Sequence, residues 1–282
     1  MSTGASDSDG PGPDAEPTVA ALRQIWASIA EVCADLDPTE WDLATECPGW
    51  TVRDQVSHMI GTERMLLGEE GPSLEGPLPS YVRNPIGESN EAWVAERRSR
   101  TGAEVLDEFR RVTAERLAQL RSFGPDRFDE VGWSPVGQVP YREFMDVRAF
   151  DCWVHEQDIR RAVGRPGGRG GEGEARSVGR VAGLLGYIVG RRVAPPEGTV
   201  VRWDVTGPLG RTVTVTVRQG RGEVGSDGGA VPDVRLALDT EWFVRLGCGR
   251  VGADEARAAG AVAIEGDAAL GERVLGEMGV TI

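Results

Sequence analysis

Hydrophobic side chains recur every three or four positions along the N-terminal half of the chain, which is the spacing of one helical face. The first such run starts at Pro17. The second follows Thr51, where Asp54 completes a capping-box pattern with aspartate in place of the usual glutamate or glutamine. Two longer runs cover about 88–122 and 141–163. Four helices joined by two long connections predict a helical bundle.

The two long connections span Gly68–Gly87 and Gly124–Val139 and are irregular in pattern. Loops of this length are uncommon in compact domains and usually serve a function. We therefore expect residues 69–87 and 124–138 to frame a substrate.

The pattern changes after the glycine-rich stretch Gly164–Glu174, which lacks the Lys-Ser/Thr of a phosphate-binding loop and is interpreted as a linker. A helix is expected at about 175–192, followed by two alternating runs at 200–207 and 211–220 that predict a β-hairpin. The remaining expected elements are a strand at 233–238, a helix at 240–250, a strand at 261–266 and a helix at 267–278. The prediction is a disordered tail at 1–16, a bundle at 17–166 and a smaller α+β domain at 175–282.

Composition narrows the function classes. The net charge of −14 argues against nucleic acid and anionic membrane surfaces as partners. All 31 basic residues are arginine, which excludes a Schiff-base lysine and a P-loop lysine. The four cysteines lie far apart without a CxxC pair, and no apolar run is long enough to span a bilayer, so a reduced, cytoplasmic setting is expected.

The chain contains only two histidines, His58 and His155, so any histidine chemistry must use one or both. His155 follows Asp151 by four positions, which places an imidazole and a carboxylate on one helical face. In helical bundles such a pair, with a third ligand from a facing helix, can bind a divalent metal such as zinc or non-haem iron. The alternatives are an ordinary helix salt link or a hydrogen-bonded core histidine.

Two segments carry a resemblance to a known family. ECPGWTVRDQVSHMIGTERMLLG (46–68) and RAFDCWVHEQDIRRAVGRPG (148–167) closely resemble the mycothiol-dependent maleylpyruvate isomerase family, a branch of the DinB-like metal-dependent bundles. The C-terminal region is similar to the family's sterol-carrier-like domain, including the turn at Val262–Asp267. The resemblance covers about 17–282 and implies a mixed fold, with a DinB-like four-helix bundle followed by a smaller α+β domain.

By this resemblance His58, Asp151 and His155 would bind zinc, although family members carry glutamate where this chain has Asp151. The family's catalytic arginine is best matched by Arg250, in a Gly-Arg pair, and would hold a substrate carboxylate and balance enolate charge. The thiol mycothiol would be the cosubstrate for isomerisation of, or S-transfer to, a small electrophile.

Two other functions stay open at this point, namely a metal-dependent hydrolase and a non-enzymatic, metal-stabilised small-molecule-binding protein. The expected partners are small molecules, without nucleic acid or membrane, and the chain would be a monomer or homodimer.

Several nearby residues have two interpretations. Trp50 and Trp153 are expected to pack the core beside the metal site, and the alternative is that they stack on a substrate. Asp54 either orients His58 or caps its helix, and Asp158 either supports the site or is a surface charge. A Ser-His-Asp triad is excluded because Ser57 adjoins His58 on a helix and points to another face.

Overall fold

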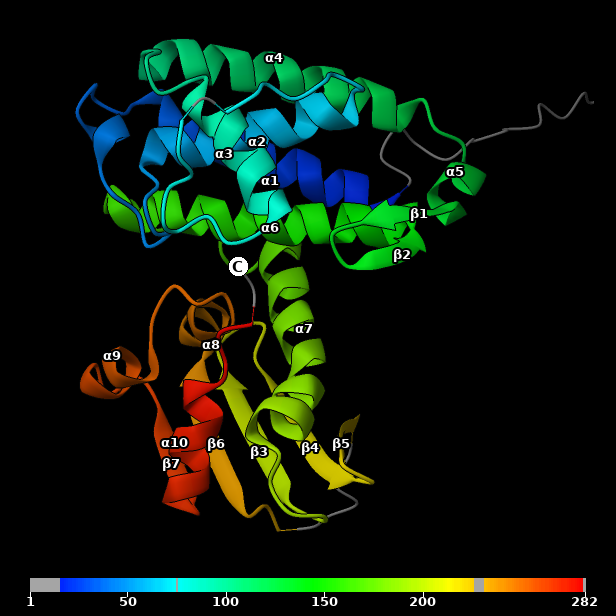
Figure 1. Cartoon of the computed structure of the whole chain (residues 1–282), viewed down its shortest axis with the longest axis vertical. Helices are drawn as coiled ribbons and strands as arrows, with labels where there is room; N and C mark the ends of the chain where they lie inside the picture. Colours follow the sequence, from blue (N-terminus) through cyan, green and yellow to red (C-terminus); the bar gives the residue numbers. More distant parts are fainter. Residues whose placement is uncertain (1–15, 75, 226–230, 281–282) are drawn as a thin grey trace, which may run out of the picture. The chain divides into compact units, whose positions relative to one another are not determined.

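The computed structural model describes residues 16–74, 76–225 and 231–280, and the chain divides into two compact units between Gly168 and Arg169 (Figure 1). The first unit is helical, and the second contains a five-stranded sheet. The predicted mixed fold, a helical bundle followed by a smaller α+β domain, is therefore confirmed. Apart from Glu16, the tail predicted at 1–16 lies outside the described residues.

The first unit is built on four long helices, of which α1 packs against α4 and α6, and α2 packs against α3, α4 and α6 (Figure 1). In chain order its elements are α1 (Pro17–Ala34), the short 3₁₀ helix η1 (Glu40–Asp42), α2 (Val52–Leu66), α3 (Pro85–Ala95), α4 (Gly102–Arg121), α5 (Pro125–Asp129), β1 (Val131–Ser134), β2 (Gly137–Pro140) and α6 (Tyr141–Ala162). The apolar faces predicted from the spacing form the buried core of this bundle.

The prediction of a single helix over 88–122 is wrong, because the helical structure is interrupted between α3 and α4. Thr101 caps the start of α4 in a capping box with Glu104, whose side chain accepts from the Thr101 N–H at 2.8 Å. Just before this cap, the buried Arg97 donates from Nη1 to the carbonyl of Trp93 at 2.8 Å. The apolar period continues on both sides of the break and so conceals it.

The irregular loop predicted over 124–139 is also wrong, since it contains the short helix α5 and the antiparallel hairpin β1–β2. Aromatic contacts hold both elements onto α6. The ring of Phe128 lies 6.0 Å from that of Tyr141, and Trp133 lies 6.3 Å from Phe144. Gly137, at φ +111°, supplies the turn. These strands are too short to produce a readable alternation.

The close packing of α3 on α2 depends on Gly61. A Cβ placed at Gly61 would lie 2.4 Å from Cβ of Trp93, which is nearer than real side chains approach. The absence of a side chain therefore lets α3 lie directly against α2, and α3 carries residues that reach the site described below.

The second unit is a five-stranded sheet in the order β5-β4-β3-β6-β7 with helices packed against it. Its elements are α7 (Glu172–Tyr187), the π-helical segment η2 (Ile188–Val193), β3 (Val200–Thr206), β4 (Arg211–Arg218), β5 (Arg221–Gly225), β6 (Val234–Asp239), α8 (Thr240–Gly247), α9 (Ala253–Ala258), β7 (Ala263–Gly266) and α10 (Ala268–Gly276). The predicted hairpin is present as the antiparallel pair β3–β4, whereas β5 and α9 were not predicted. Strands β3 and β6 are parallel, so Val201 pairs with Val234.

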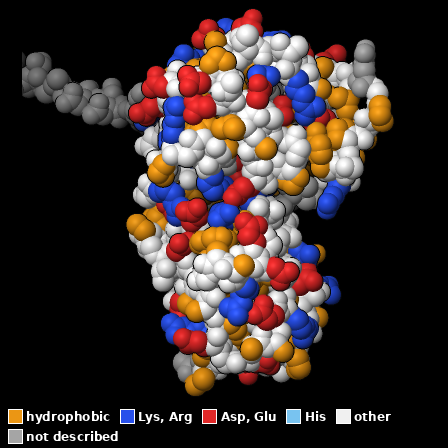
Figure 2. Space-filling view, turned by 90° about the vertical axis from the view of Figure 1, so that its left-hand side faces the viewer, with side chains coloured by type: hydrophobic (Ala, Val, Ile, Leu, Met, Phe, Trp, Pro, Cys, Tyr) orange, Lys and Arg blue, Asp and Glu red, His pale blue; other side chains and the backbone are white. Residues whose placement is uncertain are grey.

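Acidic and basic side chains are interspersed over the face shown in Figure 2. Across the described residues, arginines and carboxylates form many ion pairs, such as Arg127 with Glu130 at 2.7 Å. Within the described ranges, no helix combines the length and apolar character required to cross a bilayer.

Candidate metal centre

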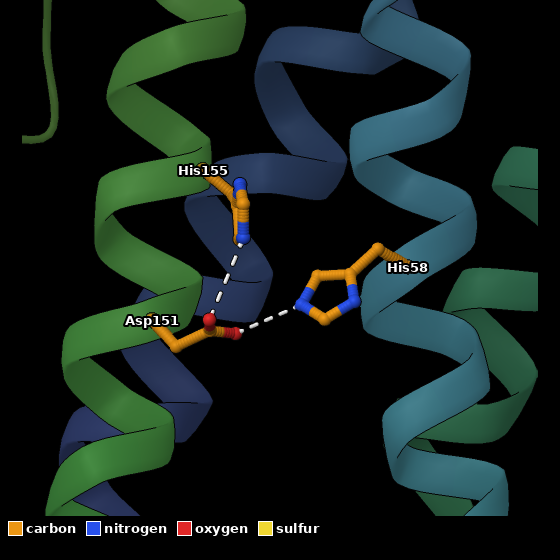
Figure 3. Close-up of side chains that lie close together, drawn as sticks. All are labelled: His58, Asp151 and His155. Atoms are coloured by element: carbon orange, nitrogen blue, oxygen red, sulfur yellow. Dashed lines mark hydrogen bonds and ion pairs between the residues drawn. The ribbon is translucent and has the colours of Figure 1, made fainter. Parts of the chain in front are cut away.

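Three side chains converge between helices α2 and α6 (Figure 3). His58 projects from α2, and Asp151 and His155 project from successive turns of α6. Nε2 of His58 lies 3.2 Å from Oδ2 of Asp151, and Nε2 of His155 lies 3.5 Å from Oδ1 of the same carboxylate. The structure therefore brings together the three residues predicted as metal ligands.

The donor set fits a divalent ion. One ligand atom from each of the three residues lies within 4.8 Å of the other two, so the donors surround a common point. Two imidazole nitrogens and one carboxylate oxygen form the ligand set of catalytic zinc sites, which keep a position open. Both histidines are buried, whereas the Asp151 side chain is 29% exposed, so the cluster meets solvent at Asp151.

The protonation states also suit a metal ligand set. Burial lowers the pKa of His58, so its imidazole is neutral at physiological pH. Burial alone would raise the pKa of Asp151, but Arg148, His58 and His155 together outweigh burial and hold the pKa well below its usual range. Neutral imidazoles and an ionised carboxylate are the forms that bind metal.

A chain of buried charges continues behind Asp151. Arg148 contacts Asp151 through Nη1 at 2.5 Å and donates through Nη2 to Oε1 of Glu63 at 2.8 Å. Glu63 in turn accepts from Nε of Arg116 at 3.2 Å. The sequence analysis did not predict this series of buried ion pairs. The i,i+3 spacing of Arg148 and Asp151 was a readable signal, whereas the contact to Glu63 depends on the packing of α2 on α6.

The structure resolves the two acidic residues that had alternative interpretations. Asp54 caps α2, because its Oδ2 accepts from the Thr51 N–H at 3.0 Å, and its other oxygen pairs with Arg98 rather than with His58. Asp158 is fully buried rather than a surface charge, and its Oδ2 lies 3.7 Å from Nδ1 of His155. Asp158 therefore belongs to the surroundings of the site.

The two tryptophans differ from each other. The ring of Trp50 lies 5.1 Å from that of His58 and 5.8 Å from that of His155, so it borders the site, but it is only partly buried. Trp153 is buried as expected, and its indole N–H donates to the carbonyl of Gly168 at 2.7 Å.

The buried thiol nearest in sequence to the cluster is Cys152, and burial raises its pKa to about 12. A thiol with this pKa stays protonated at physiological pH and is a poor nucleophile. Arg250 belongs to the second unit, where Nη1 donates to the carbonyl of Cys248 at 3.1 Å. Its predicted catalytic role remains a prediction.

Comparisons with known proteins agree with this architecture. Residues 22–160 match the family described as mycothiol maleylpyruvate isomerase N-terminal domain, and residues 189–276 match the SCP-2 sterol transfer family. Two proteins of Mycobacterium tuberculosis, from strains CDC 1551/Oshkosh and H37Rv and each called an uncharacterized protein, are 27% identical over 206 residues. That alignment covers 71% of this chain and 76% of each relative.

Solved structures extend the likeness across both units. The crystal structure of the mycothiol-dependent maleylpyruvate isomerase matches with a TM-score of 0.57 at 16% identity, over 89% of this chain and 92% of that one. A mutant of that enzyme matches with a TM-score of 0.53 at 15% identity over the same shares. At these identities the likeness concerns the fold. The two matching family models, one in each unit, place this chain among proteins that combine a mycothiol maleylpyruvate isomerase N-terminal domain with an SCP-2 domain.

Proposed function

We propose that the chain is a zinc-dependent enzyme that uses mycothiol for cis–trans isomerisation of, or thiol transfer to, a small electrophilic substrate. The observation that carries this proposal is the convergence of one ligand atom each from His58, Asp151 and His155, in a chain with this N-terminal domain. A cytoplasmic setting, where thiols stay reduced, is part of the proposal.

The three ligands would hold the ion through Nε2 of each histidine and a carboxylate oxygen of Asp151. Oδ2 of Asp151 already accepts from Arg148, so Oδ1 is the oxygen we assign to the ion. A bound zinc ion would favour the thiolate form of a thiol at the open position.

The charges around the site favour an anionic partner. The negative charges of Glu63 and Asp151 are balanced by the positive charges of Arg116 and Arg148, all within one connected set of contacts. Asp158, beside His155, lies outside this set and is paired with Arg161 at 2.7 Å. The set itself therefore supplies no net negative charge to offset a divalent ion. In a buried setting an anion such as a thiolate is then a better partner than a neutral ligand.

The second unit would serve the substrate in this proposal. Arg250 would hold a substrate carboxylate, since a guanidinium binds carboxylates in a bidentate manner. The match to the SCP-2 family supports binding of an apolar small molecule by this unit.

The test uses the full chain loaded with Co²⁺, which accepts the same ligands as zinc and is visible by absorption. Mycothiol should produce a sulfur-to-cobalt charge-transfer band, while the disulfide of mycothiol, which has no free thiol, should not. A cobalt-loaded protein whose spectrum is unchanged by mycothiol would refute the thiol-dependent proposal.

A second measurement addresses Arg250. Arg250→Ala should leave the charge-transfer band intact but lower turnover of a carboxylate-bearing electrophile by about a hundredfold. Arg257→Ala, which alters a partly exposed arginine paired with Glu272, is the matched control and should retain turnover. Equal turnover in both variants would remove Arg250 from the proposed mechanism.

A further inference from the structure

Glu91 is a buried carboxylate that connects the wall of the metal centre to the neighbouring loop. Its side chain is 1% exposed, and it projects from α3. Oε2 accepts from the indole N–H of Trp50 at 3.1 Å, and Oε1 accepts from the hydroxyl of Tyr81 at 3.0 Å. Arg98 contributes an ion pair through Nη1 at 2.7 Å.

Trp50 stands on a tight turn that is held from two sides. Gly49 adopts φ +79°, and a Cβ there would lie 2.2 Å from Cε1 of Tyr81. The ring of Tyr81 therefore lies directly on the turn, while Glu91 holds the indole that follows it. A hydrogen bond to a buried carboxylate is stronger than one between neutral groups, so it fixes the orientation of the Trp50 ring.

His58 needs such support because its second ring nitrogen is not held by a hydrogen bond. Metal-binding histidines usually donate their other N–H to a carboxylate or carbonyl, which fixes the ring. Nδ1 of His58 is buried and has no hydrogen-bond partner among the described residues. The ring of Trp50 packs at 5.1 Å from the imidazole, and so packing replaces the missing bond.

We propose that Glu91 is a positioning residue for the metal centre, which acts by holding the Trp50 ring against His58 and His155. This inference rests on the proposed metal-binding function. It also assigns a chemical character to the wall of the site. Because the indole N–H is already donated to Glu91, Trp50 offers a ligand its aromatic ring and no hydrogen-bond donor.

A double-mutant cycle on Co²⁺ affinity tests whether Glu91 acts through Trp50. Affinity is measured by competition with a chelator, with cobalt alone as the probe, in the full chain and in Trp50→Phe, Glu91→Leu and the double variant. Each single variant should bind cobalt about tenfold more weakly, the lower end of the loss for removing support from metal ligands. The double variant should be no weaker than Trp50→Phe, because residues that act through one another are not additive.

Two further measurements separate positioning from general stability. Tyr81→Phe removes the hydrogen bond from Tyr81 to Glu91 but keeps the one from Trp50 to Glu91. The Co²⁺ affinity of this variant should therefore stay within about twofold of the wild type. The cobalt absorption bands, which report ligand geometry, should shift in Glu91→Leu and not in Tyr81→Phe. If Glu91→Leu does not fold, Glu91→Met, which also lacks a carboxylate or amide oxygen to accept the indole N–H, takes its place in the same cycle.

Three outcomes overturn the inference: wild-type affinity in the Glu91 variant, additive losses in the double variant, or an equal loss in Tyr81→Phe. A wild-type chain that binds no cobalt would refute the proposed metal site itself, and the inference with it. A failure of the proposed function is therefore distinguishable from a failure of the role assigned to Glu91.

Discussion

Nη1 of Arg148 lies 2.5 Å from Oδ2 of Asp151, which stands three residues further along helix α6. The guanidinium is buried and is itself held by Glu63, so it cannot turn away without leaving a charge unpaired. Asp151 is consequently held as an anion with one oxygen engaged and the other directed to His155. Ligands of metal ions are commonly oriented in this way by a second set of contacts.

Replacing Arg148 should weaken metal binding and stability together. In Arg148→Met the carboxylate of Asp151 loses its orienting partner, so Co²⁺ affinity should fall by about 10- to 100-fold. Because a buried ion pair is broken, the free energy of unfolding should fall by about 3–5 kcal/mol. Chelator competition and denaturant unfolding measure the two effects.

The control for this variant is Arg110→Met, in which an exposed arginine 3.7 Å from Asp107 is removed. Exposed ion pairs contribute little to stability, so the free energy of unfolding of Arg110→Met should differ from the wild type by less than about 1 kcal/mol. Wild-type cobalt affinity in Arg148→Met would contradict the orienting role.

Metal binding should depend on all three ligands. The purified wild-type chain should hold one divalent ion, and alanine at either histidine or asparagine at Asp151 should abolish tight binding. Zinc at about a hundred times its dissociation constant should raise the free energy of unfolding by about 2.7 kcal/mol in the wild type. Elemental analysis and thermal unfolding test this, and full metal content in any of the variants would rule out the ligand set.

The stability of the first unit should fall in acid, in part through Glu108. This buried carboxylate accepts from Arg97, Arg64 and Arg100 at 2.8–3.0 Å. Burial would raise its pKa, but the arginines outweigh burial and the pKa is lowered. A lowered carboxyl pKa contributes stability above the ordinary pKa, and this contribution is lost as the pH falls through the folded-state value.

Glu108→Gln should accordingly cost about 3–5 kcal/mol at neutral pH, and the gap to the wild type should narrow as the pH falls below the ordinary glutamate range. Urea unfolding at several pH values measures this gap. Glu130→Gln, at an exposed pair with Arg127, is the control and should show a small, flat difference. A Glu108→Gln gap that is independent of pH would contradict the assignment.

Gly61→Ala should destabilise the chain even though alanine is the better helix former. The added methyl group would meet Trp93 at 2.4 Å, and overpacking of this kind costs about 1–3 kcal/mol. A Cβ added at Gly183, inside α7, would meet nothing within 4 Å beyond its own stretch of helix, so Gly183→Ala should instead stabilise by about 0.5–1 kcal/mol. Thermal unfolding compares the two, and a stabilised Gly61→Ala would show that α3 does not press on α2.

Local sequence patterns were sufficient for the main elements, and they narrowed the candidate ligands, whereas the ligand set itself came from the family resemblance. The apolar period located α1, α2 and α6, and alternation located the β3–β4 hairpin, because both signals depend on neighbours a few residues apart. With only two histidines in the chain, and Asp151 four positions before His155, the candidate set was small before any fold was known. The interruption between α3 and α4 was not predicted, because the apolar period continues across it.

The partners of the buried charges were decided by tertiary structure alone. Glu63 and Arg148 are 85 positions apart, and Trp50 and Glu91 are 41 positions apart. A helical period shows which face of a helix is buried, but it does not show which helix covers that face. The second charge or hydrogen-bond partner that a buried group requires is therefore supplied only when α2, α3 and α6 pack together, and this packing is what orients the candidate metal ligands.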